Sequence, residues 1–235
     1  KIFPVITNSK NYEICGILRR SNKSFKKIPV LKEKEFFKKS FDFVYICCPN
    51  SSHEKYILKS LNSDFNVICE KPFIIRKKNL NKILNLAQHK DKLIFECFMY
   101  SYHPVFEYVK KIIQFKKYGN INYVISNFRY PSLKKGDNRY KVDEGKGFFN
   151  DAASYLISLE SYLFNNFTLN FKSLTKKIKK KVDLRGYIFL EKGNQSRHYF
   201  WGEGQNYTNK LEIFFVMQLY ILTNFSVKLR MKWLN

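Results

Sequence analysis

A lysine directly follows an apolar run in the segment 66–72, whose sequence is NVICEKP. Such a run is typical of a buried strand, and a lysine at a strand's carboxyl end can point its ammonium into a cleft. There it can polarise a carbonyl or pass a proton, which makes Lys71 a candidate for acid/base chemistry. Pro72 would fix the turn that directs the side chain. From these residues alone, a surface ion pair between Glu70 and Lys71 is an equally good interpretation.

A second polar group ends the segment 43–53, whose sequence is FVYICCPNSSH. The pattern predicts a buried strand, a Pro-Asn turn and the start of a helix. In a doubly wound sheet, ligands bind at the carboxyl ends of strands, where helix N-termini offer unpaired N–H groups to phosphate. Asn50 and Ser51 could supply polar contacts there. The same residue types also cap helices for structural reasons, and this is the simpler interpretation of the segment taken alone.

A carboxylate and a phenol stand four residues apart in the segment 145–155, GKGFFNDAASY. On a helix this spacing puts Asp151 and Tyr155 on one face. Such a pair suits the transfer of a proton to or from a substrate. Without further information, Tyr155 is better interpreted as a core aromatic residue.

Short apolar runs alternate with helical patterns through the first hundred residues, which is typical of strand–helix–strand units and a parallel sheet. Apolar residues at three- and four-residue spacing predict the helices. Strands are expected at residues 12–18, 43–47, 66–69 and 93–98, and helices at residues 51–61 and 77–87. We therefore expect a doubly wound, Rossmann-type α/β domain over residues 1–101.

The pattern changes after the sequence His103-Pro104. Helices are expected at residues 104–115 and 148–164, and strands at residues 121–128, 168–174, 183–190, 195–201 and 211–215. This order predicts an α+β domain with an open, mainly antiparallel sheet over residues 102–235. No strand is predicted in the tail from Val216 to Asn235, and the sheet is expected to lack its final strands.

The chain is strongly basic, with 43 Lys and Arg against 19 Asp and Glu and a formal net charge of +24. This charge could attract nucleic acid, an anionic membrane or a phosphorylated small molecule. The basic residues are dispersed and not interleaved with aromatic residues along one segment, which favours a compositional bias and argues against nucleic acid. The densest run, residues 176–181, is expected on an edge strand, where lysines deter aggregation. A hydrophobic content of 45% excludes a disordered chain.

Five cysteines, at positions 15, 47, 48, 69 and 97, show no metal-ligand spacing. Most lie in apolar runs, so we expect reduced core residues, no metal site and a cytoplasmic setting. No signal-peptide pattern opens the sequence. Residues 213–225 are too short and too polar to cross a bilayer, so no membrane partner is expected.

Taken together, the segments 43–53 and 66–72 resemble the glucose-fructose oxidoreductase and inositol dehydrogenase family (Gfo/Idh/MocA). In that family a strand, Thr-Pro-Asn, two residues, His, a helix and a second strand lead to Glu-Lys-Pro. The matching residues are Pro49, Asn50, His53, Glu70, Lys71 and Pro72, and Cys48 stands where the family usually has Thr. The segment 145–155 resembles the family's glycine stretch followed by Asp and, four residues later, His or Tyr. The segment 96–104 resembles its crossover into the second domain.

The resemblance implies a catalytic site of Lys71, Asp151 and Tyr155, with Tyr155 as the proton donor or acceptor at the substrate hydroxyl. It also implies that a nicotinamide cofactor is bound by Arg19, Arg20, Ser21, Cys48, Pro49, Asn50, His53, Glu70 and Lys71. Arg19 stands where an Asp or Glu would hold the ribose 2′-hydroxyl of NAD. Because a guanidinium matches a 2′-phosphate, NADP is expected, with NAD as the alternative. No Gly-x-Gly-x-x-Gly loop occurs in the chain, so we expect a fragment whose phosphate-binding loop lies upstream of residue 1.

The function that the resemblance implies is hydride transfer between a nicotinamide cofactor and a sugar-like alcohol or ketone. Tyr155 in place of His, and the sequence NRY at 138–140, are similar to members that act on sugar or nucleotide-sugar ketones. A homo-oligomer through the second-domain sheet is expected. Lys146, Phe148 and Ala153 replace residues that are normally small in the family. A non-catalytic pseudo-enzyme or NADP(H) sensor of the same fold is therefore the alternative, and a basic nucleic-acid-binding protein is a remote one.

Overall fold

The structure of the chain is a computed structural model that describes residues 2–19, 25, 27–75, 77–142, 147–164, 168–177, 182–216, 219–223 and 230–233. The chain folds into two compact units and passes between them more than once. The first unit comprises Lys1–Ile46, Glu54–Cys69 and Arg76–Phe95, and the second comprises Cys47–His53, Glu70–Ile75 and Glu96–Asn235. The three candidate catalytic residues therefore all belong to the second unit. The boundary after residue 101 stays a prediction.

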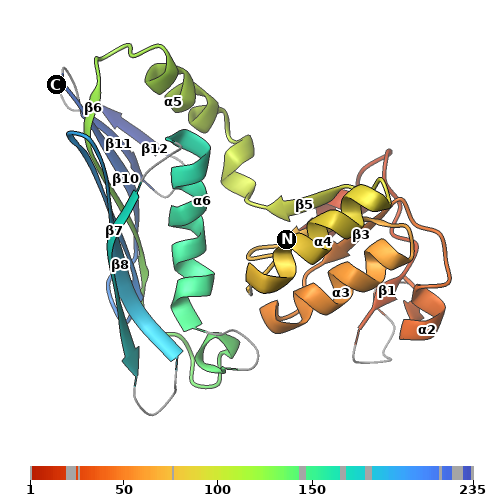
Figure 1. Ribbon diagram of the computed structural model, residues 1–235. Coiled ribbons are helices and arrows are strands. Elements are labelled where there is room, and N and C mark those ends of the chain that lie inside the picture. The colour runs from red at the N-terminus through yellow and green to blue at the C-terminus, as the bar shows by residue number, and fades with distance from the viewer. Residues whose placement is uncertain are drawn as a thin grey trace. The chain divides into compact units, whose positions relative to one another are not determined.

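The first unit is built from strand–helix–strand units, as its alternating pattern predicts. Its elements are α1 (Ile2–Thr7), β1 (Ile17–Leu18), β2 (Val30–Leu31), α2 (Glu33–Phe36), β3 (Phe43–Ile46), α3 (Asn50–Asn62), β4 (Asn66–Glu70), α4 (Lys77–His89) and β5 (Ile94–Cys97). The first residues of α3 and the last residues of β4 and β5 belong to the second unit. The strands β3, β4 and β5 form a sheet in that order with β3 and β4 parallel, while β1 and β2 form a separate parallel pair. Figure 1 shows the helices α3 and α4 beside the three-stranded sheet.

Alternate residues of β4 are buried, because successive side chains of a strand point to opposite faces. Val67 and Cys69 are 1% and 0% exposed. Ile57 and Leu61 lie four residues apart on α3 and are fully buried, as is Ile83 on α4. Residues at this spacing share one helix face, so the periodicity of the sequence correctly predicted these elements.

Two expectations for the first unit are wrong. The strand expected over residues 12–18 is reduced to Ile17–Leu18, because residues 12–16 pair with no strand in the described part of the chain and Tyr12 is largely exposed. The cysteines are not all core residues, since only Cys69 is buried, whereas Cys15 and Cys47 are exposed. Cys15 lies in the stretch that forms no strand, and Cys47 follows the last residue of β3.

The second unit is a seven-stranded open sheet with helices. Its helices are the 3-10 helices Met99–Tyr102 and Asn138–Tyr140, α5 (Pro104–Gln114), the π-helix Phe149–Ala153 and α6 (Ser154–Leu163). Its strands are β6 (Ile121–Tyr130), β7 (Thr168–Lys177), β8 (Val182–Lys192), β9 (Gln195–Glu203), β10 (Thr208–Phe215), β11 (Leu219–Thr223) and β12 (Arg230–Trp233). The order is β12-β11-β10-β6-β9-β8-β7, and every pair is antiparallel except β6 with β9. The expectation of an open, mainly antiparallel sheet is confirmed.

One face of the seven-stranded sheet is covered by α6, which runs along it in Figure 1. Tyr199 and Trp201 of β9 point to this face and share a buried cluster with Leu211 of β10 and Leu156 of α6. The alternate residues His198 and Phe200 point to the opposite, outer face, as the pleat of a strand requires.

The helix expected over residues 148–164 begins with the π-helical turn that carries Asp151. Its start is held by Asp183 of β8, whose Oδ2 accepts a hydrogen bond from the Phe149 backbone N–H at 2.6 Å. Gly147 precedes this turn with a φ of 87°, and a Cβ on Gly147 would collide with the Asp183 carboxylate. Glycine is therefore the residue that fits here.

The sheet continues into the tail, where the sequence predicted no strand. The strands β11 and β12 extend it beyond β10 by antiparallel pairing. At the opposite end β7 is the edge strand, as expected for the lysine run. Lys176 and Lys177 are its last residues, whereas residues 178–181 lie outside the described part of the chain.

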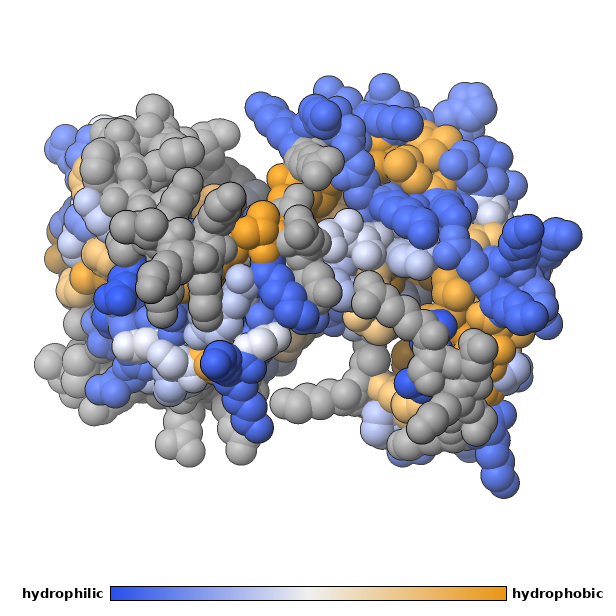
Figure 2. All heavy atoms as spheres, turned by 90° about the horizontal axis from the view of Figure 1, so that it is seen from below, coloured by the Kyte–Doolittle hydropathy of each residue, from blue (hydrophilic) through white to orange (hydrophobic). Residues whose placement is uncertain are grey.

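Hydrophilic residues cover much of the face that Figure 2 presents, with apolar residues scattered among them. Exposed large apolar residues such as Val5, Leu93 and Phe115 come from separate parts of the chain. Single apolar residues of this kind are ordinary on a protein surface. Within the described residues, no helix combines the length and the apolar character needed to span a membrane.

Candidate active site

Lys71 lies directly after β4, where the sequence places it. Its ammonium nitrogen is 2.8 Å from Asp151 Oδ1 and also donates a hydrogen bond to the main-chain oxygen of Asp151 at 2.7 Å. The same ammonium faces the ring of Tyr155, whose centroid is 4.3 Å away. The side chains of Lys71 and Asp151 are 11% and 19% exposed, so solvent screens this ion pair only weakly. The structure thus brings the three predicted catalytic side chains together.

The Asp151 carboxylate has partners on both oxygens. Oδ2 lies 2.7 Å from Arg139 Nε and accepts a hydrogen bond from the Tyr130 hydroxyl at 3.1 Å. Burial acts to raise the pKa of this carboxyl, but the charges of Lys71 and Arg139 and the hydrogen bonds to it hold the pKa below its usual value of 3.8. Asp151 is therefore a carboxylate at neutral pH and can hold the Lys71 ammonium.

Tyr155 is a core aromatic residue as well as a part of this group. It is largely buried, and its ring packs edge-on against Phe98 and Phe128. Burial raises the pKa of its hydroxyl, and the nearby charges of Asp151 and Glu70 raise the pKa further. The hydroxyl therefore keeps its proton at neutral pH, which suits a proton donor.

A cavity of about 530 Å³ lies beside this group, within the second unit. It is lined by Cys47, Cys48, Pro49, Asn50, Asp137, Asn138, Arg139 and Asp151. Asn50 is the first residue of α3, so the positive end of a helix opens onto the cavity. Cavities of about 300–1,000 Å³ are typical of small-molecule sites. Its lining combines the start of α3 with the charged side chains of Asp137, Arg139 and Asp151.

Two side chains hold the loops that frame the cavity. His53 is 1% exposed, and its ring nitrogens lie 2.9 Å from the Pro72 oxygen and 2.8 Å from the Cys48 oxygen. It therefore ties the turn after β3 to the loop that carries Lys71. Glu96 accepts a hydrogen bond from the Phe73 backbone N–H at 2.9 Å, which fixes the same loop from another side.

The remaining predicted residues are placed as follows. Arg19 is exposed after β1 in the first unit, with its guanidinium 5.8 Å from the centroid of the Phe25 ring. Arg20, Ser21 and Lys146 lie outside the described residues. Phe148 and Ala153, which replace small residues of the family pattern, are fully buried in the core of the second unit. The cofactor role of Arg19, Arg20 and Ser21 stays a prediction.

Arg139 and Tyr130 belong to the site although no motif assigned them a role at Asp151. Arg139 lies in the 3-10 helix Asn138–Tyr140, whose first turn Asp137 caps by accepting a hydrogen bond from the Arg139 backbone N–H at 2.9 Å. Tyr130 is the last residue of β6. Neither has a fixed spacing to Asp151, and the one available signal was the position of the sequence NRY ahead of the glycine segment.

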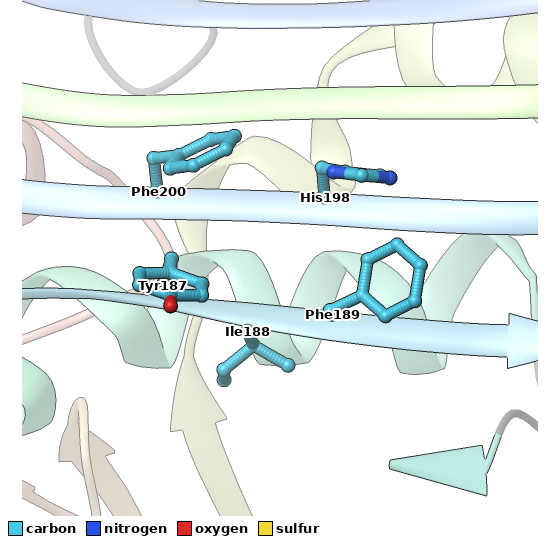
Figure 3. Close-up of a pocket in the computed structure, with 5 residues that line it drawn as sticks. All are labelled: Tyr187, Ile188, Phe189, His198 and Phe200. Carbon is cyan, nitrogen blue, oxygen red and sulfur yellow. The ribbon is translucent and has the colours of Figure 1, made fainter. Parts of the chain in front are cut away.

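A second cavity, of about 400 Å³, lies on the strands β8 and β9. Figure 3 shows the ring of Phe189 beside that of His198, with Ile188 pointing away from both, and the two ring centroids are 4.5 Å apart. Its lining has no carboxylate and no lysine. In the described part of the chain, no cluster of three or more His, Cys, Asp or Glu could hold a metal ion. The cavity beside Lys71 is therefore the candidate active site.

Residues 2–98 match the model of the Gfo/Idh/MocA oxidoreductase family, described as having an NAD-binding Rossmann fold. Among curated relatives, the chain is 26% identical over 174 residues to a dTDP-3,4-didehydro-2,6-dideoxy-alpha-D-glucose 3-reductase of Saccharopolyspora spinosa, covering 73% of this chain and 52% of the relative. It is also 26% identical over 131 residues to a scyllo-inositol 2-dehydrogenase (NADP(+)) of Bacillus subtilis, covering 53% and 39%. The chain thus spans about half or less of the length of these relatives.

The fold of both units recurs in solved structures. The chain is similar to KijD10, a 3-ketoreductase from Actinomadura kijaniata in complex with NADP and TDP-benzene, with a TM-score of 0.90 at 20% identity. The match covers 99% of this chain and 77% of that one. A likeness at this identity establishes the fold, and it includes the sheet of the second unit, which the family model does not reach. Residues 2–98, which carry the motifs at Pro49–His53 and Glu70–Pro72, are thus similar to the Gfo/Idh/MocA oxidoreductase family, and the whole chain shares the fold of KijD10.

Proposed function

We propose that the protein is an NADP-dependent oxidoreductase that transfers hydride between the cofactor and a sugar-like alcohol or ketone. The observation that carries the proposal is the meeting of the Lys71 ammonium, the Asp151 carboxylate and the Tyr155 ring beside a cavity of about 530 Å³. The pKa values of Asp151 and Tyr155 are both displaced from their usual values, and such groups beside a cavity are typical of catalytic sites. Residues 1–101 would bind the cofactor, and residues 102–235 would bind the substrate and a second subunit.

The cavity would hold one end of the dinucleotide. The N-terminus of α3 at Asn50 would face an anionic or polar part of the cofactor, and Cys48, Pro49, Glu70 and Lys71 would surround it. His53 would keep the two loops in register. A bound nicotinamide would supply or accept the hydride. The residues of this chain supply the proton and the charge that the carbonyl oxygen needs.

In the reducing direction, Tyr155 would donate its proton to the carbonyl oxygen of the substrate. A hydroxyl with a raised pKa is protonated at neutral pH, which this step requires. The Lys71 ammonium would stabilise the negative charge that develops on that oxygen. Asp151 would orient the ammonium, since it accepts hydrogen bonds from Lys71 through both Oδ1 and its main-chain oxygen.

The substrate class is a sugar ketone, including ketones of nucleotide-linked sugars. The first relative above is named as a reductase of a dTDP-linked keto sugar, and the solved structure holds a TDP compound. Tyr155 in place of His and the sequence NRY at 138–140 support the same class. The formal charge of +24 would favour a substrate that carries a diphosphate.

The choice of NADP rests on Arg19 at the end of β1. Exchanging Arg19→Asp should shift the ratio of kcat/KM values toward NAD, because a carboxylate accepts from the ribose 2′-hydroxyl and repels a 2′-phosphate. An unchanged ratio would count against this assignment.

The function is tested by NADPH oxidation with a panel of free and nucleotide-linked keto sugars. Lys71→Met should lower kcat by about 100-fold or more, and Tyr155→Phe should lower kcat with little change in KM, because each removes a group used in the chemical step. Lys78→Met is the matched control, since Lys78 is exposed on α4, and it should behave like the wild type. Turnover that survives Lys71→Met and Tyr155→Phe would overturn the proposed roles. NADPH binding without turnover would favour a non-catalytic sensor.

A further inference from the structure

Arg139 and Tyr130 have no part in the reaction proposed above, yet they occupy one whole side of Asp151. Their donors, the guanidinium Nε and the phenol hydroxyl, both reach Oδ2, while Lys71 takes Oδ1. A carboxylate bound at one oxygen can rotate about its Cβ–Cγ bond. A carboxylate bound at both oxygens is fixed in its plane, and Oδ1 then has a fixed direction.

We propose that Arg139 is a positioning residue which, with Tyr130, fixes the Asp151 carboxylate so that Asp151 holds the Lys71 ammonium against the Tyr155 ring. This inference rests on the proposed function, because the position of the Lys71 ammonium matters for catalysis only in that reaction. Arg139 itself would contact neither the substrate nor the cofactor.

The alternative is that Arg139 binds an anionic group of the substrate, since it lines the cavity. Its charge is already matched by two carboxylates, because Nε lies 2.7 Å from Asp151 and NH1 lies 3.3 Å from Asp137. The guanidinium would have to leave one of these partners to bind an incoming anion. The geometry therefore favours a role that acts through Asp151.

The groups that face Asp151 come from four elements. They are Lys71 from the loop after β4, Arg139 from its 3-10 helix, Tyr130 from β6 and Tyr155 from α6, with Asp137 behind Arg139. Removing Arg139 deletes a positive charge and a donor that lower the pKa of Asp151, whereas the burial that raises this pKa remains. The pKa of Asp151 must then rise, and the carboxylate loses the partner that fixes Oδ2.

The first test needs no turnover. The protein is labelled with ¹³C at the aspartate carboxyls, the Asp151 signal is assigned from its loss in Asp151→Asn, and the signal is followed against pH. Arg139→Met should move its titration to higher pH, Arg139→Lys should restore part of the shift because it keeps the charge, and Tyr130→Phe should give a smaller shift. Lys135→Met, an exposed cation of the same loop, is the matched control. Titration in Arg139→Met that matches this control would overturn the proposal.

The second test is a double-mutant cycle in the NADPH assay. Arg139→Met should lower kcat by about 10- to 100-fold with little change in KM, because the loss falls on a charge-assisted hydrogen bond at the reacting group. The acid limb of the kcat–pH profile of Arg139→Met should move to higher pH, in parallel with the Asp151 titration. In an Asp151→Asn background the same exchange should change kcat by less than about twofold, since Arg139 then has no carboxylate to fix. An equal loss in both backgrounds would mean that Arg139 contacts the reacting molecules, which contradicts the proposal.

The two tests separate the inference from the proposed function. In one outcome, the Asp151 titration shifts in Arg139→Met and is partly restored in Arg139→Lys, while none of the sugars supports NADPH oxidation. This outcome would support the positioning role and contradict the proposed function. Turnover with an unshifted titration would support the function and remove the positioning role. Thermal unfolding of each variant identifies any that has lost its fold, and Tyr130→Phe then serves as the milder probe.

Discussion

Lys71 is held by an ion pair and by a contact with an aromatic ring, and both interactions are stronger where solvent is excluded. The ion pair with Asp151 is largely shielded, so it is stronger than an exposed pair would be. The contact with the Tyr155 ring is a cation–π interaction, which gains strength when the cation is desolvated. Both fix the position of the ammonium. The catalytic lysine and the core aromatic residue are therefore parts of one packing arrangement.

Asp151→Asn should destabilise the protein at neutral pH by about 2–4 kcal/mol, because it leaves the charges of Lys71 and Arg139 close together without a carboxylate between them. The folded-state pKa of Asp151 lies below its usual value of 3.8. Its contribution to stability is therefore complete above about pH 4 and is lost as the pH falls through the lower folded value.

Urea unfolding of the wild type and Asp151→Asn at neutral and acid pH measures this difference. The difference in the free energy of unfolding between the wild type and Asp151→Asn should become smaller below pH ~4. Asp91→Asn, at a left-handed turn position with a φ of 50°, is a control for the removal of an acidic residue away from the site. A gap that stays constant with pH would contradict the ionised state of Asp151.

The sequence identified Lys71, Asp151 and Tyr155 as one group through the family resemblance and not through their spacing. Lys71 and Asp151 are 80 positions apart, and no local pattern relates them. Arg139 and Tyr130 were not recognised as partners of Asp151, because a 3-10 helix and a strand end have no periodicity that points to a carboxylate elsewhere. Contacts of this kind depend on the folded backbone.

At the scale of the elements, the start of the helix that carries Asp151 and Tyr155 depends on the fit between Gly147 and Asp183. Gly147→Ala should destabilise the protein by about 1–3 kcal/mol, because a Cβ at a positive φ is strained and would displace the Asp183 carboxylate from the Phe149 N–H. The same change should lower kcat, since the π-helical turn holds Asp151.

Gly193→Ala is the matched control for this prediction. Gly193 also has a positive φ, of 56°, but a Cβ there would meet nothing within 4 Å. It should cost about 1 kcal/mol from backbone strain alone and leave kcat unchanged. Thermal unfolding and NADPH oxidation measure both effects. Equal losses in the two variants would mean that the Asp183 contact does not matter.

Elements with strong periodicity were predicted well, and those without it were not. The helix α4 and the strand β4 have regular apolar spacing and lie within two residues of their expected bounds. The stretch 12–18 has apolar residues but no partner strand beyond Ile17–Leu18, so composition alone was misleading. The strands β11 and β12 were missed because the tail follows no clear alternation. The π-helical turn was expected as α-helix, since both have similar residue preferences.

At the scale of the whole molecule, the outer face of the seven-stranded sheet should join two copies of the chain. This aromatic face consists of Tyr123, Tyr187, Phe189, His198, Phe200 and Phe214. Aromatic residues are enriched at interfaces, and a sheet face can pair with its own copy about a twofold axis. Phe200→Asp should therefore shift the protein from dimer to monomer.

Analytical ultracentrifugation measures this shift. Tyr102→Asp, at a residue that is 70% exposed in the 3-10 helix Met99–Tyr102, is the control and should leave the dimer intact. A wild-type protein that sediments as a monomer would remove this expectation. The NADPH assay on Phe200→Asp then tells whether the association matters for turnover.

The central position of β6 in the sheet affects how the chain folds during its synthesis. The strand lies at the centre of the sheet, between β9 and β10, although it precedes both along the chain. On the ribosome, Ile121–Tyr130 emerges well before β9 and β10. Its backbone N–H and C=O groups can form the hydrogen bonds of the sheet only after residues 195–215 have been synthesised. During that interval the nascent segment exposes Val124 and Phe128 to other chains. Chaperone binding should therefore be greatest when the ribosome is stalled after β6 has emerged and before residues 195–215 have emerged.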